Sequence, residues 1–379
     1  MKRGDGHVIK TELTEMLGIR HPIIQAGMGP FPTNLLASAV SNVGALGLLS
    51  SSGLEVGMMV PEQRPFIGLP DEAWEKGLSS ILKEMIYRVK DDTKEVGGIF
   101  GVNIMVSTEL IDPAEEMIQT VINVRKEDSD LEKRLKVLVT SAGNPKLVAE
   151  MIKGSGLKWF HVAASVYHAK KAVDAGVDAV IASGHEGGMH IAWEPVHTMV
   201  LLPAVTDAVD VPVIGCGGFV DGKTLAAALA LGACGIQMGT RFIATKDSDF
   251  MQIWKEQIVK AGEKDTIYGR GFVGPGRYLL NKFSLHVTDL TIKKAPGLFL
   301  HQADDLMTTD PDILAGEAIG FGNLIRGEDP EDVLWPAGES AGRINSLPTV
   351  KELVEEISGD AERIVKRLPI SIENFAKPL

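Results

Sequence analysis

Short apolar runs alternate with amphipathic stretches through the first two thirds of the chain. Each run has the length of a strand, is rich in aliphatic residues, and gives way to turn-forming residues or to the start of an amphipathic stretch. Such runs are typical of strands that are buried on both faces of a sheet. They predict eight strands, at residues 22–28, 45–50, 99–105, 136–141, 157–164, 179–183, 211–216 and 235–239.

The amphipathic stretches predict helices between these strands. Asn144 and Pro145 begin one of them, and Gly176 and Gly232 end two others, as expected for helix termini. A strand followed by a helix eight times, over roughly 240 residues, predicts an α/β fold, a (β/α)8 TIM barrel. A doubly wound open sheet is the alternative. The helices are expected at residues 34–42, 71–93, 113–125, 145–154, 165–176, 196–209, 221–231 and 247–261.

The segment after residue 261 has a different pattern. It mixes proline and glycine with polar residues, lacks a strand-helix repeat and ends in a predicted helix at residues 348–367. We therefore expect a barrel at residues 1–261 and a mostly helical C-terminal appendage at residues 262–379, packed on the barrel. Residues 55–69, rich in methionine and proline, predict a long loop after the second strand, where barrel enzymes keep substrate-contacting structure.

Composition narrows the classes of function. The chain has 379 residues, of which 45% are hydrophobic, so it can bury a large core. A formal net charge of −12 without a basic cluster disfavours nucleic acid and anionic membranes as partners and leaves a small-molecule substrate. Cys216 and Cys234 are the only cysteines, which excludes a disulfide framework. With no apolar run of about 18 residues, we expect a cytoplasmic protein.

Glycine, polar and histidine residues gather where five of the predicted strands end. In a barrel the carboxyl ends of the strands form the active site, so these residues are expected to lie together. Glycines let the chain approach a flat ligand closely, and a histidine can move a proton near neutral pH. The residues concerned are 25–29, 103, 183–190, 215–218 and 237–240.

The ends of the seventh and eighth strands predict a phosphate site. The backbone amides of Gly217, Gly218, Gly239 and Thr240, with the helix start near Asp221, are placed to converge on one dianion. The chain has no Gly-x-Gly-x-x-Gly after an early strand and no Walker loop, which disfavours a dinucleotide fold and a nucleoside triphosphatase. A mononucleotide or a sugar phosphate remains.

Six motifs follow one another along the chain, at residues 17–28, 101–105, 141–145, 183–190, 217–222 and 237–242. They read Leu-Gly-Ile-Arg-His-Pro-Ile-Ile-Gln-Ala-Gly-Met, Gly-Val-Asn-Ile-Met, Ser-Ala-Gly-Asn-Pro, Ser-Gly-His-Glu-Gly-Gly-Met-His, Gly-Gly-Phe-Val-Asp-Gly and Gln-Met-Gly-Thr-Arg-Phe. This ordered set resembles the nitronate monooxygenases, formerly called 2-nitropropane dioxygenases, and their relatives the FMN-dependent enoyl-acyl-carrier-protein reductases. The resemblance covers most of the chain.

The resemblance implies that the chain binds FMN and that His190 is the active-site histidine. It implies an isoalloxazine ring near Ala26, Gly27 and Met28, with a polar contact from Asn103. It implies a phosphate held by Gly217, Gly218, Gly239 and Thr240. The remaining cofactor-binding residues expected on this basis are Ser183, Gly188, Gln237 and Met238.

Three positions depart from the family pattern. Met189 stands where the family loop usually has glycine, and Ser183 stands where many members carry glutamine or glutamate. Glu339 stands where relatives commonly have glutamine. These departures leave open the path of the loop, the contact with the flavin and the role of Glu339.

His185 lies in the same loop as His190 and is the alternative proton-transfer residue. A loop histidine bonded to backbone is the structural alternative for both. A zinc site of His185, His190 and His197 has a spacing that matches no compact metal motif, so we expect no metal.

Three functions are compatible with this sequence. The favoured hypothesis is a nitronate monooxygenase that uses dioxygen to oxidise alkyl nitronates to carbonyl compounds and nitrite, with His190 as general base or hydrogen-bond donor. The alternative is an NAD(P)H-dependent FMN reductase of an enoyl thioester or a quinone, which needs no dinucleotide fold of its own. The third is a flavin-binding barrel without catalysis. An acidic barrel with an appendage is also compatible with a homodimer.

Overall fold

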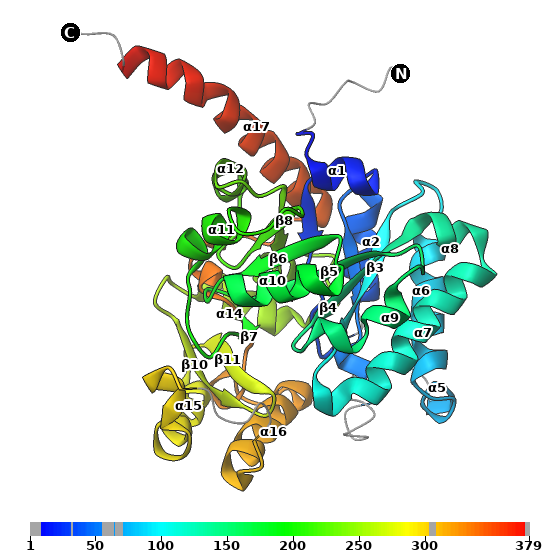
Figure 1. Cartoon of the computed structure of the whole chain (residues 1–379). Helices are drawn as coiled ribbons and strands as arrows, with labels where there is room; N and C mark the ends of the chain where they lie inside the picture. The colour runs from blue at the N-terminus through cyan, green and yellow to red at the C-terminus, as the bar shows by residue number, and fades with distance from the viewer. Residues whose placement is uncertain (1–8, 32, 55–63, 65–70, 303–307, 376–379) are drawn as a thin grey trace.

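The computed structural model describes residues 9–31, 33–54, 64, 71–302 and 308–375. Eight parallel strands form one sheet in the order β1-β9-β8-β6-β5-β4-β3-β2, and a bridge between Ile24 and Leu46 joins its two edges. The predicted TIM barrel is therefore confirmed (Figure 1). Apart from Arg64, the loop predicted at residues 55–69 lies outside the described residues. The strands are β1 Ile23–Gln25, β2 Gly47–Ser50, β3 Phe100–Met105, β4 Leu135–Ser141, β5 Lys158–Ala163, β6 Ala179–Ser183, β8 Val213–Cys216 and β9 Gly235–Met238.

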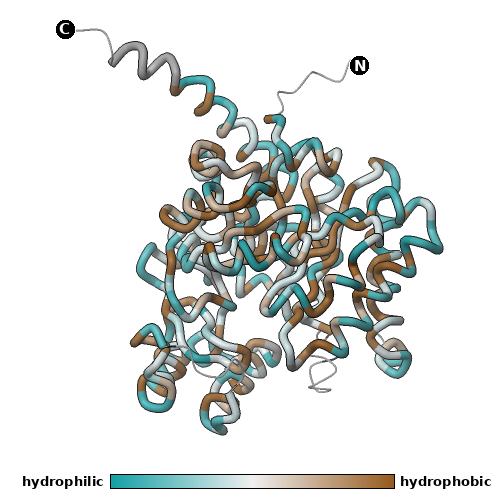
Figure 2. The backbone as a smooth tube through the Cα atoms, viewed as in Figure 1, coloured by the Kyte–Doolittle hydropathy of each residue, from teal (hydrophilic) through white to brown (hydrophobic). Residues whose placement is uncertain are grey.

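The strands are buried on both faces because each contributes to two hydrophobic layers. Alternate residues such as Leu48, Val139 and Ile181 fill the inside of the barrel. Their neighbours pack outward against the helices in a second, larger cluster. This two-sided burial explains why the strands read as continuous apolar runs. In Figure 2 hydrophobic stretches run through the interior, and hydrophilic stretches recur on the outer turns.

Helices cover the outside of the barrel, mostly at the predicted positions. The helix expected at residues 71–93 is divided at Lys76 and Gly77, where Gly77 has a φ of 83°. A short helix before the first strand was not predicted; it inserts Leu13 and Leu17 into the inner cluster. The helices up to residue 260 are α1 Glu12–Leu17, α2 Asn34–Asn42, α5 Asp71–Glu75, α6 Leu78–Asp92, α7 Ile111–Glu127, α8 Ser129–Arg134, α9 Ala149–Ile152, α10 Val166–Ala175, α11 Thr198–Thr206, α12 Gly222–Ala230, α13 Thr240–Ile243 and α14 Gln252–Lys260.

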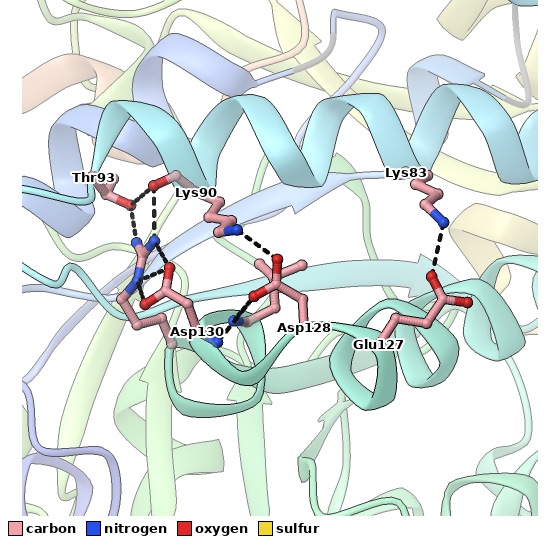
Figure 3. A network of polar contacts seen from close by, with 8 residues as sticks. Lys83, Lys90, Thr93, Glu127, Asp128 and Asp130 are labelled. Atoms are coloured by element: carbon pink, nitrogen blue, oxygen red, sulfur yellow. Dashed lines mark hydrogen bonds and ion pairs between the residues drawn. The ribbon is translucent and has the colours of Figure 1, made fainter.

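Polar contacts join α6 to the end of α7 and to α8 on the surface (Figure 3). Lys90 pairs with Asp128, whose carboxylate also caps the start of α8. Arg134 pairs with Asp130 and donates to the hydroxyl of Thr93 and the carbonyl of Lys90. These contacts fix the outer helices and lie away from the strand ends that carry the predicted site.

The C-terminal segment contains a β-hairpin that was not predicted. β10 Thr266–Gly271 pairs antiparallel with β11 Gly274–Leu279, and β11 pairs with the two-residue strand β7 Met189–His190. Repeated glycines in both hairpin strands hide the apolar alternation that normally marks a strand. In Figure 1 the hairpin lies at one end of the molecule with α15 Lys282–Lys294 and α16 Pro311–Arg326.

The last helix, α17 Val350–Phe375, returns to the barrel and packs against α12 and α2. Gly222 of α12 lies so close to it that a Cβ there would approach Asp360 to 2.4 Å, and His21 bonds Ser358. The helix therefore packs among the helices that cover the barrel, although it belongs to the segment after residue 261. It then projects beyond the body (Figure 1). The division at residue 261 stays a prediction.

Candidate functional site

The hairpin holds His190 at the carboxyl end of the barrel. His190 is the register partner of Gly276, and the next residue, Ile191, donates its N–H to Pro275. His190 is exposed to solvent, yet surrounding protein lowers its pKa to about 4. The ring is therefore neutral near pH 7.

Glu186 anchors the loop that leads to His190. Its carboxylate accepts from the N–H of Thr198 at 2.9 and 3.0 Å and from the Thr198 hydroxyl at 2.9 Å. The same hydroxyl lies 2.9 Å from the carbonyl oxygen of Gly217, and Gly184 donates to Cys216. The loop after β6 is thus attached to the loop after β8 and to the start of α11.

Met189 has a left-handed backbone, with φ of 56°, which favours glycine over other residues. Its side chain packs on a small cluster that includes Tyr278 and Leu334. The preceding Gly188 faces the backbone of Ala337 and Gly338, which a Cβ would approach to 2.6 Å. Met189 and Gly188 therefore attach the loop to the C-terminal segment.

The strand ends bring the predicted glycine and polar residues to one edge. Ser183 is opposite Cys216, Cys216 is opposite Gln237, and Gln25 is opposite Met238. The segment after β1 lies between Gly239, which follows β9, and Asn103 of β3. Its residues are Ala26, Gly27 and Met28, of which Ala26 and Met28 face Gly239 and Gly27 faces Asn103.

Gly27 leaves room for Asn103. A Cβ on Gly27 would lie 2.4 Å from the Asn103 Cβ, far inside normal contact. The Asn103 amide nitrogen lies 3.4 Å from the Ser141 hydroxyl. The glycine therefore allows an amide side chain to lie directly against the strand-one segment.

Two glycines after β8 have left-handed backbone, with φ of 91° for Gly217 and 82° for Gly218. Gly239 precedes α13 without a side-chain cap, while the hydroxyl of Thr240 accepts from Gly338. The start of α12, which was expected to share the phosphate, is capped by the Asp221 carboxylate. The donors for an anion are thus the loop amides, with the α12 terminus already facing a carboxylate.

Gln237 carries the most direct sign of a missing polar partner. Its side chain is buried, and its Oε1 has no hydrogen-bond partner among the described residues. Buried polar atoms are nearly always paired in native proteins. Gln237 stands between the Cys216 end of β8 and the Gly239 turn, so a polar ligand at this edge would supply that partner.

The two loop histidines have different surroundings. His185 is buried, its ring lies 5.2 Å from Tyr268 and 5.5 Å from His197, and burial together with Arg277 lowers its pKa to about 4. His190 is the one that is open at the strand ends. No group of three metal-ligating side chains occurs within the described ranges. Two surface hollows, beside Trp335 and beside Lys170, contain none of the predicted site residues.

Sequence reasoning missed Arg277. This side chain is buried, donates to the carbonyl of His185 at 3.1 Å, and forms an ion pair with Glu339 at 3.1 Å. Nothing in the pattern Gly-Pro-Gly-Arg marks a buried arginine, because its partners are remote in sequence. Its partner Glu339, in contrast, is one of the residues that the sequence analysis singled out.

The comparisons with known proteins agree with this arrangement. The family model described as nitronate monooxygenase matches residues 10–360, so the chain belongs to the nitronate monooxygenase family. The solved structure of FabK from Thermotoga maritima is 31% identical, covers 96% of this chain and 99% of its own, and superposes with a TM-score of 0.74. Members of this kind are flavin-dependent, and the chain is a flavin-dependent oxidoreductase.

Two curated relatives differ in how much of the chain they match. The (3aS,4S,5R,7aS)-5-hydroxy-7a-methyl-1-oxo-octahydro-1H-indene-4-carboxyl-CoA dehydrogenase of Rhodococcus jostii (strain RHA1) is 30% identical over 95% of this chain and 97% of its own length. A probable nitronate monooxygenase of Staphylococcus aureus (strain N315) is 30% identical over 72% of this chain and 79% of its own length.

None of the helices in the described ranges has the length and apolar character that a membrane crossing requires.

Proposed function

We propose that this protein is an FMN-dependent oxidoreductase of an acyl thioester, with His190 as the group that gives or takes the proton. The observation that carries the proposal is the position of His190, a neutral and accessible imidazole above the glycine-lined strand ends. A proton-transfer group must be reachable by the substrate and in its working protonation state. We assign this role to His190 because it is exposed to solvent and its ring is neutral near pH 7.

The residues at the strand ends fit FMN. We assign the flat ring to the segment Ala26, Gly27 and Met28, where Gly27 leaves room for the side chain of Asn103. The unpartnered Oε1 of Gln237 fits a ring N–H donor. The backbone amides of Gly217, Gly218, Gly239 and Thr240 are the groups we assign to the phosphate. Ser183, Gly188 and Met238 complete the set.

When bound, FMN would carry the two electrons of the reaction. The protein contributes orientation and the proton. The ladder with Gly276 fixes the backbone of His190 in the segment that follows β6. A neutral imidazole can accept a proton at one nitrogen or donate one from the other, which serves reduction and dehydrogenation alike.

The substrate class rests on the extent of similarity. The coenzyme A dehydrogenase and FabK each match nearly the whole chain, whereas the staphylococcal nitronate monooxygenase matches 72% of it. The residues after 261 include the hairpin that holds His190. NADH or NADPH is the electron donor we propose for the reductive direction.

Nitronate oxidation is the second candidate, which the family model favours. The neutral state of His190 suits a general base that removes a proton from a nitroalkane. The two candidates use the same residues and differ in the source of the electrons.

Anaerobic flavin absorbance separates the candidates. The purified protein is mixed separately with NADH, NADPH, propyl nitronate and a saturated acyl-CoA. Bleaching by a nicotinamide or by the acyl-CoA, with reoxidation by an enoyl-CoA, supports the thioester proposal. Bleaching by propyl nitronate alone contradicts it and supports nitronate oxidation. A His190→Ala protein that retains flavin and full turnover would contradict the role of His190 in both.

A further inference from the structure

Arg277 lies behind the loop that carries His190. Its side chain is only 4% exposed. One terminal nitrogen donates to the Thr266 hydroxyl at 3.1 Å, and the other donates to the carbonyl of His185 at 3.1 Å. The backbone of Arg277 is the register partner of Met189. A single residue thus contacts both the first part of the loop and the strand in which the loop ends.

Glu339 holds the loop from a third segment of the chain. Its N–H donates to the carbonyl of Glu186 at 3.0 Å, and its carboxylate pairs with Arg277 at 3.1 Å. Its neighbour Gly338 bonds Thr240 and faces the backbone of Glu186, Gly187 and Gly188. The loop, the hairpin and the segment at residue 339 therefore each contact the other two.

The residue within this set of contacts, Met189, has a strained backbone. Met189 has positive φ, a conformation that is unfavourable for a residue other than glycine. Such a conformation persists when surrounding contacts determine it. The two departures from the family pattern, Met189 and Glu339, are in this way parts of one arrangement: the first requires support, and the second helps to supply it through Arg277.

We propose that Arg277 and Glu339 are positioning residues that act through His190, holding residues 185–190 in the conformation that places the imidazole at the strand ends. This inference rests on the proposed role of His190 and adds to it the residues that fix the ring. Both residues reach the loop through its backbone: Arg277 donates to the carbonyl of His185, and the N–H of Glu339 donates to the carbonyl of Glu186. The ion pair orders the loop and makes no contact with substrate in this account.

A mutant cycle tests the proposal. Arg277→Gln removes the positive charge and the guanidinium donors to Thr266 and His185, and Glu339→Gln removes the negative charge while keeping a side chain of similar size. A displacement of about 1 Å at a reacting group can lower a rate roughly 100-fold, so we expect Arg277→Gln to lower kcat by about 10- to 100-fold, with a smaller loss for Glu339→Gln. In the His190→Ala background neither change should lower the rate further. An equal loss in both backgrounds would overturn the proposal.

A second readout does not need turnover. The imidazole of His190 is followed by NMR in protein with isotope-labelled histidine, and the His190→Ala protein assigns its signal. The pKa of about 4 should rise in Arg277→Gln as the ring loses its enclosure. Arg125→Gln is the matched control, because Arg125 is also buried and bonded to backbone carbonyls, away from the loop.

The outcomes separate this inference from the proposed function. An unchanged His190 titration in Arg277→Gln, or an equal change in Arg125→Gln, contradicts the positioning role. Full activity of His190→Ala contradicts the proposed function, and the titration then still decides whether Arg277 positions the ring.

Discussion

The carboxylate of Glu186 accepts both the N–H and the hydroxyl of Thr198, at 2.9 to 3.0 Å. Glu186 therefore caps α11 and fastens the His190 loop to it. Glu186→Ala should lower the free energy of unfolding by roughly 1–3 kcal/mol, because the cap is lost and buried donors are left unpaired. Urea unfolding measures this change. Glu194→Ala, at an exposed position between β7 and α11, is the control and should have little effect.

The pKa of His190 sets the expected pH dependence of catalysis. Burial lowers that pKa to about 4, and the neutral ring, which acts in either proposed reaction, dominates above this pH. For the free enzyme, kcat/KM should be constant with respect to His190 from about pH 5 to pH 8 and fall about tenfold per pH unit below pH 4. Rates are measured together with circular dichroism to exclude unfolding. A loss of activity centred near pH 6.5 would contradict the enclosure of the ring.

Strand positions and the active edge were predictable because they depend on local patterns. All eight barrel strands overlap their predicted ranges, since buried strands are short and apolar and a parallel barrel fixes which ends meet. The predicted residues Ser183, Gln237 and Gly239 do lie at one edge. Their roles toward FMN stay a prediction.

Contacts between remote segments could not be predicted. The ladder between β7 and β11 joins residues that are far apart in sequence and has no alternating pattern, so the sequence predicts a mostly helical segment where the hairpin lies. Arg277 resembles a surface residue in sequence, and only the fold shows that it is buried beside Glu339. The C-terminal helix packs against α2 and α12 for the same reason: its partners lie elsewhere in the chain.

His21 makes folding stability sensitive to acid. Its ring is buried and bonds Ser358 at 2.7 Å, and burial and Arg20 lower its pKa from 6.5 to about 4. The unfolded chain therefore binds a proton at this site between about pH 6.5 and pH 4 where the folded chain does not, so stability falls as pH falls through that range. From pH 7 to pH 5 this one group accounts for about 2 kcal/mol.

The variant His21→Asn tests this linkage. An asparagine can still bond Ser358 but does not titrate, so the loss of unfolding free energy between pH 7 and pH 5 should be about 2 kcal/mol smaller than in the unmodified protein. Urea unfolding at the two pH values measures it. His286→Asn changes the same residue type at an exposed position and serves as control. Equal losses in His21→Asn and the unmodified protein would refute the linkage.

Gly27 tests the proposed cofactor bed. A Cβ here would lie 2.4 Å from the Cβ of Asn103, so Gly27→Ala must displace Asn103 or the strand-one segment. We expect the purified variant to lose most of its FMN, measured as flavin absorbance per protein after gel filtration. Gly359→Ala is the control, because its Cβ would meet only the end of the Arg363 side chain, at 3.5 Å. Stoichiometric FMN in Gly27→Ala would contradict the assignment of this segment to the flavin.

The two thiols provide a test of the site without any substitution. Burial raises the pKa of Cys216 to about 11 and that of Cys234 to about 12, although Cys216 lies among the proposed flavin-binding residues beside Ser183. Thiol reagents attack the thiolate, so both cysteines should react slowly with a disulfide reagent near pH 8 and rapidly once the protein is unfolded in urea. Fast reaction of Cys216 in the folded protein, identified by mass spectrometry of the labelled peptide, would show that it is an activated group and would require a chemical role for it that His190 alone does not cover.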